Sequence, residues 1–152
     1  EHKNTLKALL DSNKNNEIIP KLFVDGAADL HSKTAGIGGV VYINEGEVAN
    51  FSEPLYDKTN NESEYLSLIK GIQVIHELKF GNVLIYSDSE LIVKQVTGEY
   101  KIKNDRMKKL NDEVKLNLRK LTSWSIEHVR REKNTRADEL SKLGMEEARG
   151  SK

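Results

Sequence analysis

Two short apolar runs in this chain each end in an aspartate, and this pattern restricts the fold more than any other feature. The stretch KLFVDG carries Leu22, Phe23 and Val24 directly into Asp25, and the stretch VLIYSD ends in Asp88. Both runs are short and rich in strand-forming residues, so we expect two central strands of one sheet. A buried carboxylate without a partner is costly, and each aspartate therefore needs a partner or a chemical function.

The rest of the pattern alternates strands and helices. A hairpin is expected from GIGGVVYI through a Glu45-Gly46 turn to EVANFSEPL, and a last strand is expected at SWSIEHV. Helical spacing of apolar residues predicts four helices: 61–80, 89–97, 107–121 and one that begins near Asn134. The predicted order β-β-β-α-β-α-α-β-α indicates an α/β fold whose mixed sheet has an antiparallel hairpin at one edge and parallel crossovers.

Three glycines, Gly36, Gly38 and Gly39, raise the question of a phosphate-binding loop. They precede a strand rather than a helix, so the context of a dinucleotide-binding loop is missing. Glycines at the start of a strand indicate a bulge or close packing instead.

Composition narrows the class of protein. The chain has 152 residues, 24 basic and 24 acidic, and no cysteine. This length suits one domain, and no apolar run approaches the roughly 18 residues that a membrane helix needs. Zero net charge does not by itself argue for nucleic acid, although EYKIKNDRMKK and HVRREKNTR are locally basic. The absence of cysteine excludes thiolate chemistry and fits a reducing compartment, so we expect a cytoplasmic protein without a membrane partner.

The domain organisation is expected to be simple. Residues 1–17 are polar and indicate an N-terminal extension or linker, residues 18–148 one folded domain, and residues 149–152 a C-terminal tail. Because the chain begins with Glu1 rather than Met, it also fits a part of a larger chain.

Two further acids join the strand-end aspartates. Glu64 shares a helical stripe with Leu68 and Ile72, about one turn from the predicted helix start, and so faces the sheet. Asp138 falls in the first turn of the last helix. Each has a structural alternative, because Glu64 could close a capping box and Asp138 could complement the helix dipole.

Four acids gathered at strand ends and helix starts repel one another unless a cation joins them. Ligands that are all carboxylates suit Mg²⁺ or Mn²⁺ rather than zinc. Two such ions about 4 Å apart can serve phosphodiester hydrolysis, in which one ion activates water and the other stabilises the leaving oxygen.

The same residues carry a family resemblance. The motifs FVDGAAD, GIGGVVY, TNNESEYLSLIKGI, IYSDSELIVKQVTGEY and REKNTRADELSKLG come in the order and spacing of type 1 ribonuclease H. Over about residues 20–146 the chain resembles the short, reverse-transcriptase-like branch of that family. The resemblance implies that 18–148 is a ribonuclease H domain with a five-stranded mixed sheet flanked by helices. It maps the family's catalytic and metal-binding acids onto Asp25, Glu64, Asp88 and Asp138.

The resemblance also implies a reaction and a substrate. The reaction is hydrolysis of the RNA strand of an RNA–DNA hybrid with two Mg²⁺ or Mn²⁺ ions, which leaves a 5′-phosphate and a 3′-hydroxyl. Selective cleavage of RNA requires that the 2′-hydroxyl be read, and in the family the Asn pair, here Asn60 and Asn61, takes part. The backbone at Gly26 and Ala27 is expected to approach the RNA, and we expect a monomer. Helix capping is the structural alternative for the Asn pair, and Thr59 or Asn60 is the expected cap of that helix.

Several departures from the family pattern keep a second interpretation open. DLHSKTAG replaces a Gly/Pro-rich turn, Glu90 stands where the family usually has Gln, the basic protrusion is missing, and the only nearby histidine, His128, falls at a strand end. Cations that could compensate for these losses are Lys101, Lys103, Arg106, Arg130, Arg131 and Lys133. The alternative is a ribonuclease H-fold module that binds nucleic acid with weak or no catalysis.

Overall fold

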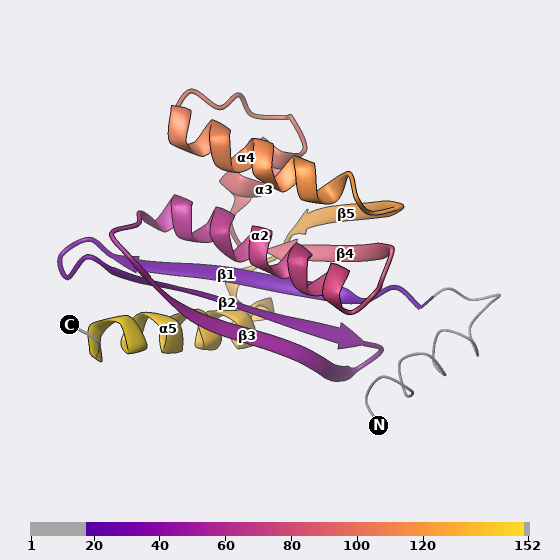
Figure 1. Cartoon of the computed structure of the whole chain (residues 1–152), viewed down its shortest axis with the longest axis horizontal. Coiled ribbons are helices and arrows are strands. Elements are labelled where there is room, and N and C mark those ends of the chain that lie inside the picture. Colours follow the sequence, from indigo (N-terminus) through magenta and orange to yellow (C-terminus); the bar gives the residue numbers. More distant parts are fainter. Residues whose placement is uncertain (1–17, 151–152) are drawn as a thin grey trace.

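A mixed sheet forms the centre of the computed structural model, which describes residues 18–150 (Figure 1). Its five strands lie in the order β3-β2-β1-β4-β5. The strands are β1 (Lys21–Asp29), β2 (Thr34–Ile43), β3 (Gly46–Tyr56), β4 (Asn82–Ser87) and β5 (Ser123–His128). Strands β1, β2 and β3 pair antiparallel, whereas β4 runs parallel to both β1 and β5. The predicted fold class is confirmed.

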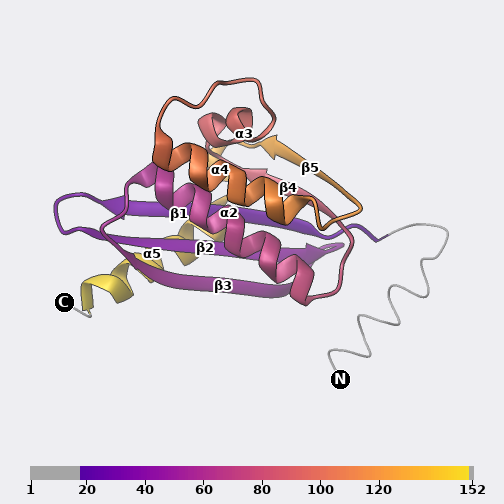
Figure 2. The ribbon, with the colours of Figure 1, turned by 45° about the horizontal axis from the view of Figure 1, so that its top comes forward.

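Helices cover both faces of this sheet (Figures 1 and 2). The helices are α2 (Asn60–Glu77), α3 (Glu90–Val96), α4 (Asp105–Leu118) and α5 (Thr135–Gly150), and a 3₁₀ turn, η1 (Arg131–Lys133), precedes α5. Helix α2 packs against β1 and β2, α4 packs on α2, and α5 packs against β1, β2 and β3 from the opposite face. The order of elements agrees with the prediction except for η1, which was not expected.

The main core lies between the sheet and α2. The predicted apolar stripe of that helix is fully buried: Tyr65, Leu68, Ile69, Ile72 and Ile75. Leu22 and Val24 of β1 meet α2 at Gly71, where a Cβ atom would lie 2.8 Å from a methyl carbon of Leu22. The strand therefore packs directly against the helix backbone, which holds α2 close to β1.

The start of α2 follows the predicted chemistry. Thr59 is the N-cap, and Glu62 completes a capping box with it. The helix begins at Asn60 and ends at Glu77, earlier than the predicted end at residue 80, and the chain turns at Lys79 with a φ of 69°. The hairpin turn also differs by one residue from the prediction, because Asn44 takes the left-handed conformation with a φ of 56° and Gly46 already belongs to β3.

Close packing explains two of the glycines on β2. A Cβ atom on Gly36 would lie 2.3 Å from the Ser141 carbonyl oxygen, and one on Gly38 would lie 2.3 Å from the Ser141 amide nitrogen. Helix α5 therefore rests on the bare backbone of β2, so that of the two predicted alternatives, a bulge or close packing, close packing holds for these glycines. This contact fixes the height of α5 above the sheet.

The ends of the described chain bear on the predicted domain limits. The predicted extension at 1–17 lies outside the described residues. Helix α5 continues to Gly150, so its last two residues fall within the range predicted as a tail, and Arg149 pairs with Asp29 of β1 at 3.0 Å. Within residues 18–150, no helix combines the length and the apolar character that crossing a membrane would require.

Candidate active site

Three carboxylates meet where β1 and β4 stop pairing. The last paired residues of these parallel strands are Val24 and Ser87, and the next residue of each strand is Asp25 or Asp88. Carboxylate oxygens of Asp25, Asp88 and Glu64 all lie within 4.8 Å of one another. The prediction that the two strand-end aspartates are neighbours is confirmed, and we call these three residues the carboxylate cluster.

Glu64 reaches the cluster because α2 lies so close to β1. The Gly26 amide donates a hydrogen bond to the Glu64 carboxylate. A Cβ atom on Gly26 would lie 2.4 Å from the Ser63 carbonyl carbon, so only glycine permits this approach. The capping-box interpretation of Glu64 is wrong, because Glu62 fills that position. The Glu64 side chain is thus turned toward the sheet.

Asp138 lies beside the carboxylate cluster rather than within it. It belongs to the first turn of α5, as predicted, and lines the same pocket as the three clustered acids. Its carboxylate forms an ion pair with the Lys142 ammonium group at 3.0 Å. The buried Ser141 hydroxyl donates to the Asp138 carbonyl oxygen at 2.9 Å and lies 3.4 Å from Asp25 Oδ2. Ser141 therefore connects the helix that carries Asp138 with Asp25.

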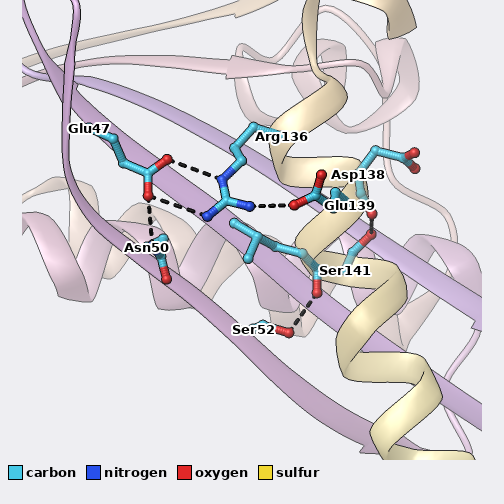
Figure 3. A network of polar contacts seen from close by, with 8 residues as sticks. Glu47, Asn50, Ser52, Arg136, Asp138, Glu139 and Ser141 are labelled. Carbon is cyan, nitrogen blue, oxygen red and sulfur yellow. Dashed lines mark hydrogen bonds and ion pairs between the residues drawn. The ribbon is translucent and has the colours of Figure 1, made fainter.

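A polar network holds the first turns of α5 on β3 (Figure 3). Arg136 Nε donates to Glu47 at 3.1 Å, and the Ser52 hydroxyl donates to the Leu140 carbonyl oxygen at 2.7 Å. The Asp138 side chain points away from Arg136 (Figure 3). The network therefore anchors the helix without occupying the Asp138 carboxylate.

Burial and mutual repulsion shape the protonation of the cluster. Asp25 and Glu64 are only 6% and 8% exposed. Burial raises the pKa of the Asp25 carboxyl, and the nearby charges of Glu64 and Asp88 raise it further. Burial also raises the pKa of Glu64, although the hydrogen bonds from Asp25 and Gly26 oppose this rise. Burial and mutual repulsion therefore oppose the ionisation of Asp25 and Glu64 together.

A pocket of about 480 Å³ opens over these acids. It is lined by every residue that the sequence predicted for the site: Asp25, Gly26, Ala27, Asn60, Asn61, Glu64, Asp88 and Asp138. Asn60 and Asn61 are exposed in the first turn of α2, and their capping interpretation is wrong because Thr59 is the cap.

The pocket also contains cations. Arg131, one of the loop cations singled out in the sequence, lines the pocket, and its charge lowers the pKa of Glu64. Lys142 was missed; the available signal was its spacing of one helical turn from Asp138. His128 ends β5 as an exposed residue, as predicted, and Glu90 is exposed at the start of α3.

The strand order of this mixed sheet is that of a ribonuclease H-like fold. The acids lie at the ends of β1 and β4 and on helices of both faces of the sheet, as this fold class requires. A family model described as "Reverse transcriptase-like" matches residues 23–144. The chain belongs to the type 1 ribonuclease H family, in its reverse-transcriptase-like branch.

Individual relatives agree with this assignment. The chain is 29% identical over 127 residues to Ribonuclease HI of Halobacterium salinarum. The aligned region covers 83% of this chain and 64% of that protein. It is 30% identical over 126 residues to Bifunctional protein Rv2228c of Mycobacterium tuberculosis, covering 82% of this chain and 35% of that one. The chain therefore spans less than two thirds of these curated relatives. The solved structure of LC11-RNase H1 in complex with an RNA/DNA hybrid is 30% identical, with a TM-score of 0.79, and the match covers 85% of this chain and 98% of that one.

Proposed function

We propose that this protein is a ribonuclease H that hydrolyses the RNA strand of RNA–DNA hybrids with two bound divalent cations, leaving a 5′-phosphate and a 3′-hydroxyl. The carboxylate cluster of Asp25, Glu64 and Asp88 within the fold of this family is the observation that carries the proposal. The relative that was solved with an RNA/DNA hybrid supports the substrate class.

The donor set fits Mg²⁺ or Mn²⁺. The cluster offers only carboxylate oxygens, which hard divalent cations prefer. The raised pKa values of Asp25 and Glu64 mark a site where negative charge is poorly compensated by the protein alone. We propose that Asp25, Glu64, Asp88 and Asp138 hold the ions, which when bound supply an activated water and charge stabilisation for the leaving oxygen.

Residues around the cluster have separate tasks in this proposal. The exposed Asn60 and Asn61 at the start of α2 contact the minor groove and read the 2′-hydroxyl of the RNA strand. The backbone at Gly26 and Ala27 borders the same pocket and allows a sugar–phosphate strand to approach closely. Arg131 brings positive charge to the pocket and attracts the phosphate there. A monomeric state and a cytoplasmic location remain predictions.

The test is a cleavage assay with an end-labelled RNA–DNA hybrid in Mg²⁺, in Mn²⁺ and in EDTA, with duplex DNA and duplex RNA of the same sequence as comparison substrates. We expect cleavage of the hybrid in either metal and none in EDTA. Asp25→Asn should lower the rate by more than about a hundredfold, because loss of even an outer-shell partner of a metal costs 10–100-fold. The control is Asp112→Asn, an exposed aspartate on α4, which should retain the wild-type rate.

Two outcomes would contradict the proposal. Near wild-type cleavage by Asp25→Asn would show that the carboxylate cluster is not needed for the reaction. Salt-dependent binding of the hybrid without cleavage, even in Mn²⁺, would show instead that the protein is a nucleic-acid-binding module without catalysis.

A further inference from the structure

Three aromatic side chains gather on the face of the sheet that α5 only partly covers. Helix α5 packs against β1, β2 and β3, and the neighbouring strand β4 contributes Tyr86 to the same face. The rings of Phe23 and Tyr86 stack with centroids 4.7 Å apart, and Tyr42 meets Phe23 edge-on at 5.7 Å. All three side chains are partly exposed. Phe23, Tyr42 and Tyr86 are called the aromatic cluster below.

A small pocket of about 150 Å³ lies between this cluster and the start of α5. Phe23, Val40 and Tyr42 form its wall on the sheet, and residues 133–137 form the opposite wall. Two basic side chains, Lys133 and Arg136, line this pocket, and they differ in whether an acidic side chain already pairs with them. Arg136 is occupied by Glu47 and Glu139, as Figure 3 shows, whereas Lys133 is exposed and makes no ion pair with any residue from 18 to 150.

This small pocket, called the aromatic pocket below, lies next to the proposed active site along β1 and η1, and the two pockets share no lining residue. Phe23 and Asp25 are alternate residues of β1, so their side chains leave the same face about 7 Å apart along the strand. The 3₁₀ turn η1 joins the two pockets, because Arg131 at its start lines the active-site pocket and Lys133 at its end lines the aromatic pocket. The buried Asn134 side chain donates to the Val24 carbonyl oxygen at 3.0 Å and fixes this turn against β1.

We propose that the aromatic pocket binds an unpaired base of the strand that continues beyond the active site, so that the preferred substrate is a hybrid with a single-stranded tail. The inference rests on the proposed function and adds a second subsite to it. Aromatic rings that stack bases, next to a cation that contacts phosphate, form the usual surface for single-stranded nucleic acid. Glu127 lies opposite Tyr86 in the sheet register and places negative charge there, so the phosphates pass over Lys133 rather than over β5.

The test compares binding of a blunt hybrid with binding of hybrids whose RNA strand carries a short tail at the 5′ end or at the 3′ end. A 2-aminopurine base in the tail reports stacking by quenching of its fluorescence, and EDTA prevents cleavage during titration. We expect one of the two tails to tighten binding by about fivefold or more, the lower end for one stacked base, and to quench the probe. Tyr42→Leu should remove both effects.

Lys133→Ala provides a second variant that does not disturb the packed rings, because the lysine is exposed. It should weaken binding of the tailed hybrid and reduce the slope of log affinity against log salt by about 0.7, the value for one phosphate contact on a single strand. Trp124→Leu and Lys120→Ala are the matched controls, since both side chains are exposed and line neither of the two pockets. Both controls should keep the wild-type gain from the tail.

The outcomes separate this inference from the proposed function. Cleavage of the blunt hybrid in Mg²⁺ without any gain from either tail would overturn the aromatic subsite alone. Loss of the gain in the control variants as well as in Tyr42→Leu would also overturn it, because the effect would not be local. Absence of any hybrid binding or cleavage would overturn both proposals.

Discussion

The substitution Asp25→Asn should make the metal-free protein more stable while it abolishes cleavage. Asp25 is 6% exposed, and this burial raises the pKa of its carboxyl, which the neighbouring Glu64 and Asp88 raise further. In the unfolded chain this carboxyl loses its proton near the ordinary pKa of 3.8. The folded state holds the proton to higher pH, so the unfolding free energy falls as pH rises above about 4. An amide at this position carries no charge and avoids that loss.

The magnitude follows from proton linkage. One proton retained only in the folded state changes the unfolding free energy by up to about 1.4 kcal/mol per pH unit. Between pH 5 and pH 8 the upper limit for Asp25 is therefore about 4 kcal/mol. Because Glu64 shares the site and takes part of the charge, we expect the asparagine variant to exceed wild type by about 1–3 kcal/mol at pH 8, and by less at pH 5.

Urea denaturation in EDTA at pH 5, 6, 7 and 8 measures this difference. The control is Asp112→Asn, which changes an exposed aspartate on α4 and should follow the pH dependence of wild type. A variant Asp25→Asn that is less stable than wild type at pH 8 would refute the argument. So would a difference between variant and wild type that stays constant from pH 5 to pH 8.

Three further predictions concern the metal, the contact between β1 and α2, and the helix cap. Mg²⁺ at about a hundred times its dissociation constant should raise the unfolding free energy of wild type by about 2.7 kcal/mol, measured by thermal denaturation, and should do much less for Asp25→Asn. Gly26→Ala should cost about 1–3 kcal/mol in denaturant unfolding, because its Cβ would meet the Ser63 backbone at 2.4 Å, and should lower cleavage as Glu64 is displaced; an unchanged rate would contradict the need for this close approach. Thr59→Ala should cost about 1 kcal/mol in the same measurement through loss of the N-cap, and wild-type stability would show that the capping box contributes little.

Local sequence patterns predicted most of the elements correctly. The stripe from Tyr65 to Ile75 has helical spacing and is buried along its length, and Thr59 is the cap that its position suggested. The apolar runs that end in Asp25 and Asp88 became adjacent parallel strands. These features depend on residues a few positions apart, so the spacing of residue types along the chain is enough to predict them.

Other features could not be predicted from local patterns. Some positions have two candidate residues close together, and some contacts join segments far apart in the chain. Glu62 and Glu64 both lie near the start of α2, and only the backbone geometry decides that Glu62 closes the capping box while Glu64 faces the sheet. Asp138 has the position of a ligand by sequence; in the structure its carboxylate pairs with Lys142 and also interacts with the Asp25 carboxyl, next to the three residues of the carboxylate cluster. The link through Ser141 to Asp25 joins segments far apart in the chain.

The sequence by itself determined the order of the elements and the candidate acids, because periodicity, helix caps and strand ends are local properties. Only the tertiary structure decided how closely these acids approach one another. That outcome depends on backbone contacts between distant segments, at Gly26 against Ser63 and at Gly38 against Ser141. The absence of a side chain at these glycines brings α2 close to β1 and α5 close to β2, and no pattern along the chain specifies a distance of that kind.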